Sequence, residues 1–319
     1  MDEHPVDVYE PKTLLEAIRY YSDLDIATKT FAALRWPEGV TCPYCLSKEN
    51  YYAPSRRIWK CKACRKQFSP KVGTICEDSA IGFDKWLSAM WMIANDKNGI
   101  SSHELHRGLG VTQKSAWFML QRIRLAMHTG TFEKAVGQVE VDETFIGGKA
   151  RNMHKWIREQ KITGTGGKDK TMVVGVLERG GKVRATVHGS QKKKALHAHV
   201  REHVQPGAEV FTDALKSYEG LHPEFAHQVV DHAVEYVKGN VHTNGLENFW
   251  SLLKRTLKGT YVSVAPYHLF RYLDEQSFRF NERKDEQGDR GRFKMVVKAC
   301  SGKRLTYKKL TGKPQISAK

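Results

Sequence analysis

No stretch of this sequence approaches the roughly 18 consecutive apolar residues that a membrane-spanning helix needs. The opening stretch, MDEHPVDVYE, is polar and acidic and does not resemble a secretory signal. Hydrophobic residues still make up 40% of the 319 positions, which is enough for real cores and excludes wholesale disorder. We therefore expect a cytoplasmic protein with one large domain or two to three smaller ones.

Acidic residues are in short supply. There are 35 Asp and Glu against 52 Lys and Arg, which gives a formal net charge of +17. A chain this basic with a normal share of apolar residues usually binds a polyanion, because neutralised phosphates release their counterions. The balance predicts a polyanion, such as a nucleic acid, as the partner. A generically basic protein without such a partner is the alternative.

The deficit of acids is greatest near the C-terminus. From Arg290 to Lys319 the sequence has ten Lys or Arg and no Asp or Glu. We interpret residues 289–319 as a basic tail that contacts a nucleic-acid backbone. A solvated tail with no partner would have the same composition.

Cysteine is scarce as well, with six residues in all, but four of them are ordered. Cys42, Cys45, Cys61 and Cys64 follow the spacing C-x2-C-x15-C-x2-C, which is typical of zinc sites. Two close pairs on tight turns bring four thiolates to one tetrahedral Zn²⁺. Disulfides are a poor explanation without an export signal, and four incidental cysteines are the remaining alternative. The spacing predicts a structural zinc ion; the other two cysteines are expected to be core or surface thiols.

The sequence around the cysteines divides into three segments. Residues 1–35 predict one or two short helices. Residues 36–75 form the predicted zinc ribbon, whose second hairpin (RRIWKCKACRKQFS) carries six cations and predicts a basic surface. Residues 76–130 have a helical pattern and form a third segment.

The third segment resembles a helix-turn-helix. One helix ends at Leu109, Gly110 supplies the turn, and Thr112 caps the next helix. That second helix is expected to expose three cations: Lys114, Arg122 and Arg124. A basic three-helix packing unit with no role in DNA recognition would look similar.

From residue 136 the pattern changes to strands that alternate with helices. Strands are predicted at 138–146, 171–177, 183–187, 209–212 and 228–230. Helices are predicted at 192–204, 242–257 and 267–280, with one more between the last two strands. Residues 149–170 are too polar for a core and are interpreted as a mobile, DNA-facing insertion. The order predicts an α/β domain with a mixed sheet over residues 136–288.

Three acids lie where this order places strand and helix ends. Asp142 is within the first strand, Asp213 follows the fourth strand, and Glu247 is in the first turn of the next helix. Strands and a helix that carry acids can gather carboxylates around Mg²⁺, which prefers oxygen ligands. Lys254, seven residues after Glu247, lies on nearly the same helix face and is a candidate phosphate ligand. An ordinary surface lysine is the alternative.

Each acid also has an explanation without chemistry. Asp142 shares a strand face with Glu140 and would then lie on a solvated edge. Asp213 would cap the following helix. Glu247 follows Asn244 by three residues, which fits a capping box. The residues alone leave these alternatives open.

The motifs together resemble one family. The ribbon CPYC…CKAC is followed by RKQFSPKVGTI and EDSAIGFDKW, and then by VEVDETFIGGK, TDALKSY, HTNGLENFWSLLKR and FRFNER. With these motifs the chain resembles bacterial insertion-sequence DDE transposases that have an N-terminal zinc ribbon and an ISXO-two-like catalytic domain. The resemblance covers roughly residues 36–281.

The resemblance implies an RNase H-like catalytic domain with assigned site residues. By motif position, the metal-binding catalytic acids are Asp142, Asp213 and Glu247, and Lys254 is the accompanying basic residue. The resemblance, and not the spacing, selects Asp142 over its neighbours Glu140 and Glu143.

The resemblance also implies an activity. Two Mg²⁺ or Mn²⁺ ions would support cleavage at terminal inverted repeats and attack of the freed 3′-OH on target DNA. The expected partners are these double-stranded DNAs and further copies of the chain, as a dimer or higher oligomer. A zinc-ribbon DNA-binding regulator with an inert RNase H-like domain is one alternative. A structure-selective nuclease of the same fold is another, and the N-terminal DNA-binding modules argue against it.

Overall fold

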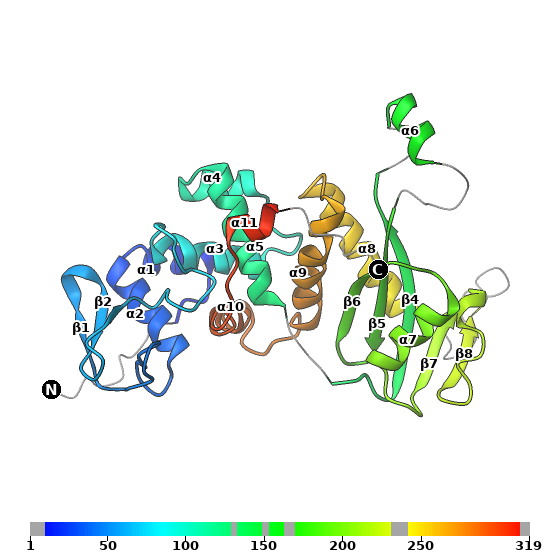
Figure 1. Ribbon diagram of the computed structural model, residues 1–319, viewed down its shortest axis with the longest axis horizontal. Helices are drawn as coiled ribbons and strands as arrows, with labels where there is room; N and C mark the ends of the chain where they lie inside the picture. Colours follow the sequence, from blue (N-terminus) through cyan, green and yellow to red (C-terminus); the bar gives the residue numbers. More distant parts are fainter. Residues whose placement is uncertain (1–9, 129–132, 149–152, 163–169, 231–241, 313–319) are drawn as a thin grey trace. The chain divides into compact units, whose positions relative to one another are not determined.

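The computed structural model describes residues 10–128, 133–148, 153–162, 170–230 and 242–312 (Figure 1). The chain divides into two compact units, residues 1–128 with 282–319, and residues 129–281. Each unit has its own core. In the described part of the chain, no helix is both long and apolar enough to cross a membrane.

The first unit begins with two short helices, as predicted. They are α1 (Leu14–Tyr21) and α2 (Leu24–Arg35). The side chains of Thr13 and Asp23 accept hydrogen bonds from backbone N–H groups in the first turns. Both helices therefore start at residue types that commonly cap helices.

The ribbon follows as a three-stranded antiparallel sheet. Its elements are β1 (Asn50–Ala53), the 3₁₀ turn η1 (Pro54–Arg56), β2 (Ile58–Cys61) and β3 (Gln67–Phe68). Its core contains Trp59 and Phe68, two of the cysteines, and Ala32 from α2. A core this small gives little stability by itself, so the cysteine cluster is part of what holds the ribbon together.

The predicted helix-turn-helix elements are present in the first unit. They are α3 (Phe83–Asn95), α4 (Ser102–Leu109) and α5 (Gln113–Met127). Ser101 and Glu104 form a capping box at α4, and Thr112 caps α5. Gly110 ends α4 with a φ of 60°, a backbone conformation that favours glycine.

Two of the three cations expected to be exposed on α5 are buried instead. Arg122 and Arg124 are only 7% and 1% exposed. The Arg122 guanidinium donates to the carbonyl of Glu77 at 2.9 Å and to that of Leu305 at 3.1 Å. The prediction was wrong because C-terminal residues pack on this side of the helix. Lys114 is exposed, as predicted.

Part of the predicted basic tail belongs to this core. Residues 289–298 form α10 (Asp289–Lys298), and α11 (Tyr307–Thr311) follows. Phe293 of α10 is 2% exposed; its ring stacks on Tyr21 at 5.5 Å and contacts Trp91 at 5.2 Å. The composition of the segment is basic, but its apolar residues recur at helical spacing and are buried.

The second unit is built on a five-stranded mixed sheet in the order β6-β5-β4-β7-β8. The strands are β4 (Gln138–Ile146), β5 (Thr171–Glu178), β6 (Val183–His188), β7 (Glu209–Asp213) and β8 (Ala226–Val230). The first three form an antiparallel meander, whereas β4, β7 and β8 run parallel. This mixed sheet with its helices confirms the predicted RNase H-like class.

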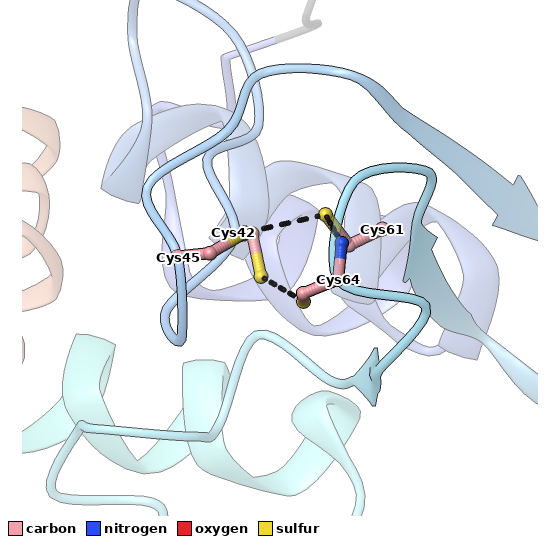
Figure 2. A group of neighbouring side chains, drawn as sticks. All are labelled: Cys42, Cys45, Cys61 and Cys64. Atoms are coloured by element: carbon pink, nitrogen blue, oxygen red, sulfur yellow. Dashed lines mark hydrogen bonds between the residues drawn. The ribbon is translucent and has the colours of Figure 1, made fainter.

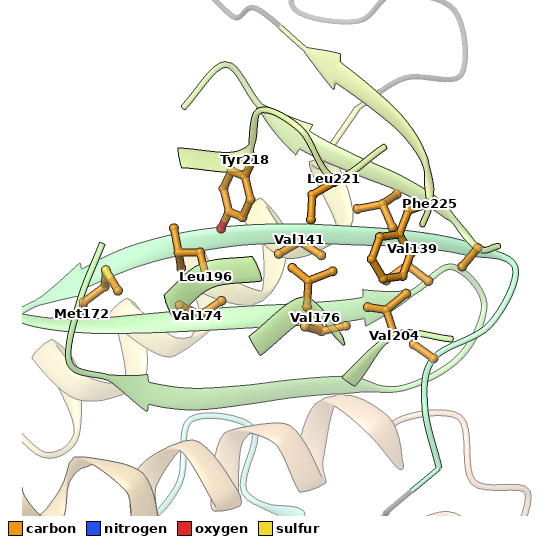
Figure 3. Packing of buried hydrophobic residues seen from close by; sticks show 14 residues of the cluster. Val139, Val141, Met172, Val174, Val176, Leu196, Val204, Tyr218, Leu221 and Phe225 are labelled. Carbon is orange, nitrogen blue, oxygen red and sulfur yellow. The ribbon is translucent and has the colours of Figure 1, made fainter. Parts of the chain in front are cut away.

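Helices cover both faces of this sheet. On one face α7 (Lys193–His203) packs Leu196 and Val200 against Val141 and Val176 (Figure 3). On the other face lie α8 (Asn244–Gly259) and α9 (Leu269–Asn281), joined by the 3₁₀ turn η4 (Pro266–His268). The central strand β4 is therefore covered on both sides, which positions any polar residue on it firmly.

Two connections in the second unit differ from the predicted elements: the one between β7 and β8, and the insertion between β4 and β5. Between β7 and β8 the expected helix is only the 3₁₀ turn η3 (Lys216–Tyr218). Tyr218, at the end of this turn, is buried in the core. The predicted insertion contains α6 (Lys155–Lys161), while residues 149–152 and 163–169 lie outside the described residues.

Candidate cysteine cluster and acidic site

The structure brings the four predicted cysteines together (Figure 2). The sulfurs of Cys42 and Cys64 are 3.7 Å apart, and those of Cys45 and Cys61 are 3.5 Å apart. Four sulfurs bound to one zinc at about 2.3 Å are separated by about 3.8 Å along the edges of the tetrahedron. The donor set and its spacing therefore fit a structural Zn²⁺.

The two cysteine pairs lie on equivalent turns. The backbone N–H of Cys42 donates to the carbonyl of Ser47 at 2.9 Å, and that of Cys61 donates to the carbonyl of Lys66 at 3.0 Å. The residue after each second cysteine, Leu46 or Arg65, has a φ near the left-handed region, at 61° and 62°. This repeated turn aims both cysteines of each pair at one point.

The ribbon presents a basic surface, as predicted from its second hairpin. Five of its six cations are exposed, namely Arg56, Arg57, Lys62, Arg65 and Lys66, and Lys60 is half-buried. The ribbon is therefore electrostatically suited to a DNA backbone.

The predicted acids come from neighbouring elements on one face of the second unit's sheet. In the parallel pair of β4 and β7, Glu140 is opposite Phe211. Two residues further along the strands lie Asp142 and Asp213, which therefore share that face and lie beside each other. Both residues are half-buried, and Oδ1 of Asp142 accepts the backbone N–H of Glu143 at 2.8 Å.

Glu247 reaches the same face from α8. The residue before it, Leu246, donates its backbone N–H to Glu140 at 3.0 Å. Three residues after it, the indole N–H of Trp250 donates to Oδ2 of Asp142 at 2.9 Å. These two contacts bracket Glu247 and place the first turn of α8 over the acids of β4.

A glycine permits this close approach. Gly175 of β5 is paired with Asp142. A Cβ atom at Gly175 would lie 2.7 Å from the Trp250 ring and 2.8 Å from the side chain of Leu246. The strand can therefore carry no side chain here while Trp250 holds Asp142.

Glu140, the other acid on this strand face, is an anchor for α8. Its carboxylate is 1% exposed, forms an ion pair with Arg179 at 3.0 Å and lies 3.5 Å from His242. Together with its bond to the N–H of Leu246, it satisfies a backbone donor at the N-terminus of α8. The carboxylate of Glu140 therefore has a structural role, which is to hold the N-terminus of α8.

The three acids influence one another electrostatically. The pKa of Asp142 is raised to about 6, mainly by burial and also by the charges of Asp213 and Glu247, while the hydrogen bond from Trp250 acts in the opposite direction. A divalent cation among these oxygens would relieve the repulsion, so the residues present fit Mg²⁺. In the described part of the chain, only the cysteines and His199, Glu202 and His203 have all their ligand atoms within 4.8 Å. The acids are therefore spread more openly.

Glu143 and Tyr218 form a neighbouring pair that the sequence did not point out. Glu143 is on the opposite strand face and accepts a hydrogen bond from the Tyr218 hydroxyl at 2.8 Å. Burial raises the pKa of Glu143 to about 7, against this hydrogen bond. The pair ties β4 to the segment that follows Asp213.

The structure bears on the alternatives that the sequence left open. Asp142 is on the central strand and not on an edge. Asp213 accepts the N–H of Leu215 at 3.1 Å, so one of its oxygens has a local turn contact. α8 has no side-chain cap at its N-terminus, and Glu140 takes that place. Lys254 lies half-buried further along α8.

A further set, His199, Glu202 and His203, lies on α7, on the sheet face opposite the acids. Its signal in the sequence is the i, i+4 spacing of the two histidines, which places them on one side of a helix. Trp250 and Gly175 had no comparable signal, because their roles depend on packing between α8 and β5.

The structure combines a basic zinc ribbon, a helical module and a mixed sheet with three acids on one face. Together these features define a class of DNA-processing proteins. Residues 134–281 match the family model of the ISXO2-like transposase domain, and residues 25–67 match that of the transposase zinc-ribbon domain. The chain belongs to this transposase family, and its transposase domain is that of a DNA-processing enzyme.

Two relatives support the assignment. An uncharacterized protein in transposable element ISH50 of Halobacterium salinarum is 29% identical over 263 residues, which cover 77% of this chain and 87% of the relative. An uncharacterized transposase-like protein of Haemophilus influenzae is 33% identical over 101 residues, which cover 31% of this chain and 81% of the relative. No solved structure matches the chain.

Proposed function

We propose that this protein is a DDE-type transposase that cuts the ends of an insertion sequence at terminal inverted repeats and joins the freed 3′-OH to target DNA. Asp142, Asp213 and Glu247 are the proposed metal-binding catalytic acids. The observation that carries the proposal is the convergence of these three residues on one sheet face of a transposase domain.

The chain's own residues would prepare the reaction. Trp250 and the backbone N–H of Glu143 each hold one oxygen of Asp142, which fixes the orientation of the carboxylate. Glu140 holds the first turn of α8 and thereby the position of Glu247. Lys254 would bind a DNA phosphate beyond the acids. When bound, two Mg²⁺ ions would stabilise charge on the attacking and leaving oxygens of in-line displacements.

DNA recognition would come from the first unit. The exposed cations of the ribbon suit contacts to the backbone, and α4 and α5 would read the inverted repeats as a helix-turn-helix. Because two arginines of α5 are buried, only the N-terminal part of this helix, around Lys114, would contact the DNA bases. Pairing of two element ends would require a dimer or a higher oligomer.

The test is substitution of each acid. Asp142→Ala, Asp213→Ala and Glu247→Ala should each lower cleavage and strand transfer at least about 10³-fold, because the charge stabilisation of a bound metal is worth several kcal/mol. DNA binding should persist in each variant. Lys254→Ala should lose less activity, since the metal ligands remain. Glu202→Ala, an exposed carboxylate on α7, is the matched control.

The metal dependence separates this function from its alternatives. Mn²⁺ should replace Mg²⁺, whereas Ca²⁺ should support binding with little turnover. A protein that binds the ends without any divalent-dependent cutting would be a regulator, and one that cuts without joining would be a nuclease. Near-normal activity of Glu247→Ala would move the third acid elsewhere. Asp231 and Glu235, the next candidates in sequence, lie outside the described residues.

A further inference from the structure

A cavity of about 600 Å³ opens in the second unit, on the two elements β4 and α8 that also carry acids of the proposed site. It lies between the end of β4, the C-terminal half of α8 and the loop that follows α8. Its apolar lining includes Ile146, Leu257 and Val264. The volume is within the range of pockets that hold small organic groups, and the apolar walls suit a flat ring.

Three lysines stand around this cavity: Lys170, Lys254 and Lys258. Lys170 and Lys258 are exposed, and Lys254 is half-buried. Among the residues that the structure describes, none of the three forms an ion pair with a carboxylate. An apolar hollow edged by three lysines that pair with no described carboxylate is suited to a ligand with both a ring and a phosphate.

Val262 lines the cavity and has both an unusual exposure and an unusual backbone conformation. Its side chain is 78% exposed, and its φ is 60°. A β-branched residue rarely adopts this backbone conformation. An exposed apolar side chain on strained backbone is costly in the free protein, and such strain is found where a segment serves a ligand.

The cavity continues the face that carries the acids. Lys254 is seven residues after Glu247, which is about 10 Å along the axis of α8. Ile146 is four residues after Asp142, which is about 13 Å along β4. A DNA strand whose phosphate lies at the acids therefore reaches the cavity within a short distance.

We propose that this cavity receives an unstacked nucleotide of the DNA next to the cut, with Val262 as the apolar wedge and the three lysines on the adjoining phosphates. The inference rests on the proposed function, since it takes the acids as the place of cutting. Apolar side chains of DNA-binding proteins open base steps in this way, and enzymes stack extruded bases between apolar side chains.

The experiment uses the full chain and duplex oligonucleotides that carry the element's own end. Single 2-aminopurine bases replace successive bases around the cut, and their fluorescence rises when a base is unstacked. The measurement is made in Ca²⁺, so it requires binding but no cutting. We expect a rise of severalfold at one or two adjacent positions, and none with Val262→Gly. Glycine adopts the positive φ of this position without strain, so the change is compatible with the loop's conformation.

Cutting in Mg²⁺ gives the second readout. Val262→Gly should cut about tenfold more slowly, and an abasic site at the responding position should restore its rate to within about twofold, because no base then needs to be unstacked. Val262→Ile keeps an apolar wedge and should behave as wild type. Lys258→Gln should weaken the fluorescence rise, whereas Lys194→Gln, on the opposite face of the sheet, should not.

The outcomes separate the two proposals. If bound DNA shows no responding position, or if Val262→Gly responds as wild type does, the nucleotide cavity is refuted while the proposed function stands. If a position responds but wild-type protein never cuts in Mg²⁺, the proposed function fails and the cavity is confirmed as a DNA-binding site.

Discussion

At the scale of single residues, the acidic site depends on the contact between Trp250 and Gly175. The indole both packs on β5 and donates to Asp142, so its position sets that of the carboxylate. Such a contact couples the packing of α8 to the chemistry of β4. A change that leaves all three acids in place can therefore still disturb the site.

We predict that Gly175→Ala destabilises the second unit by about 1–3 kcal/mol, the usual cost of overpacking. The new Cβ atom would meet the Trp250 ring at 2.7 Å, so the ring must move and release Asp142. The melting temperature and the cleavage rate should both fall. Gly189→Ala is the matched control, because a Cβ atom there meets nothing within 4 Å. Unchanged stability and cleavage in Gly175→Ala would show that the ring does not need this space.

At the scale of elements, two parts depend on a few buried contacts. The N-terminus of α8 is held by a carboxylate from β4, and the ribbon is held by its cysteines around a core of a few side chains. α10 is a third case, because a basic segment supplies apolar residues to the first unit.

For the ribbon we predict one Zn²⁺ per chain, lost in Cys61→Ser. A ribbon without its metal should unfold, weaken binding to the element's ends and leave the second unit folded. Elemental analysis of freshly purified protein measures the metal, and Cys76→Ala, a buried cysteine outside the set, should retain it. Wild-type protein that contains no zinc would refute the assignment.

For α10 we predict that a chain ending at residue 288 has an unstable first unit. Loss of a buried Phe such as Phe293 alone typically costs about 3–5 kcal/mol, and Val296 and Val297 are buried beside it. Calorimetry should show a lower melting temperature for the first unit. Deletion of residues 313–319 is the control and should leave this temperature unchanged. An equal melting temperature for both truncations would mean that α10 adds nothing to the core.

At the scale of the whole molecule, the +17 charge predicts DNA binding that weakens steeply with salt. If six or more phosphates are neutralised, affinity should fall at least about 10³-fold between 50 and 200 mM salt. Filter binding or fluorescence anisotropy across this range measures the slope. A flat response would contradict the electrostatic argument.

The contribution of the C-terminal charges is better tested by substitution than by deletion, since deletion would remove α10. Lys308 and Lys309 are exposed on α11. If each contacts one phosphate, changing both to Gln should lower the magnitude of the logarithmic salt slope by about 1.8. If the slope stays the same, these lysines do not contact DNA.

The sequence by itself determined the features that depend on residues close together in the chain. The cysteine spacing, the caps at Ser101 and Thr112, and the strand and helix periods predicted the ribbon and most elements of both units. The motifs assigned the family, which the comparisons confirmed. The assignment of Asp142, Asp213 and Glu247 as catalytic acids remains a prediction.

Only the tertiary structure decided what lies beside what. Arg122 and Arg124 are basic residues at helical positions, and nothing nearby in the sequence shows that C-terminal residues bury them. Glu140 and Asp142 share a strand face, yet the first binds the backbone at the start of α8 while the second is held by the Trp250 indole, because the two meet different residues of that helix. Such contacts join positions 106, 108 and 183 residues apart, so local pattern carries no trace of them and packing alone selects them.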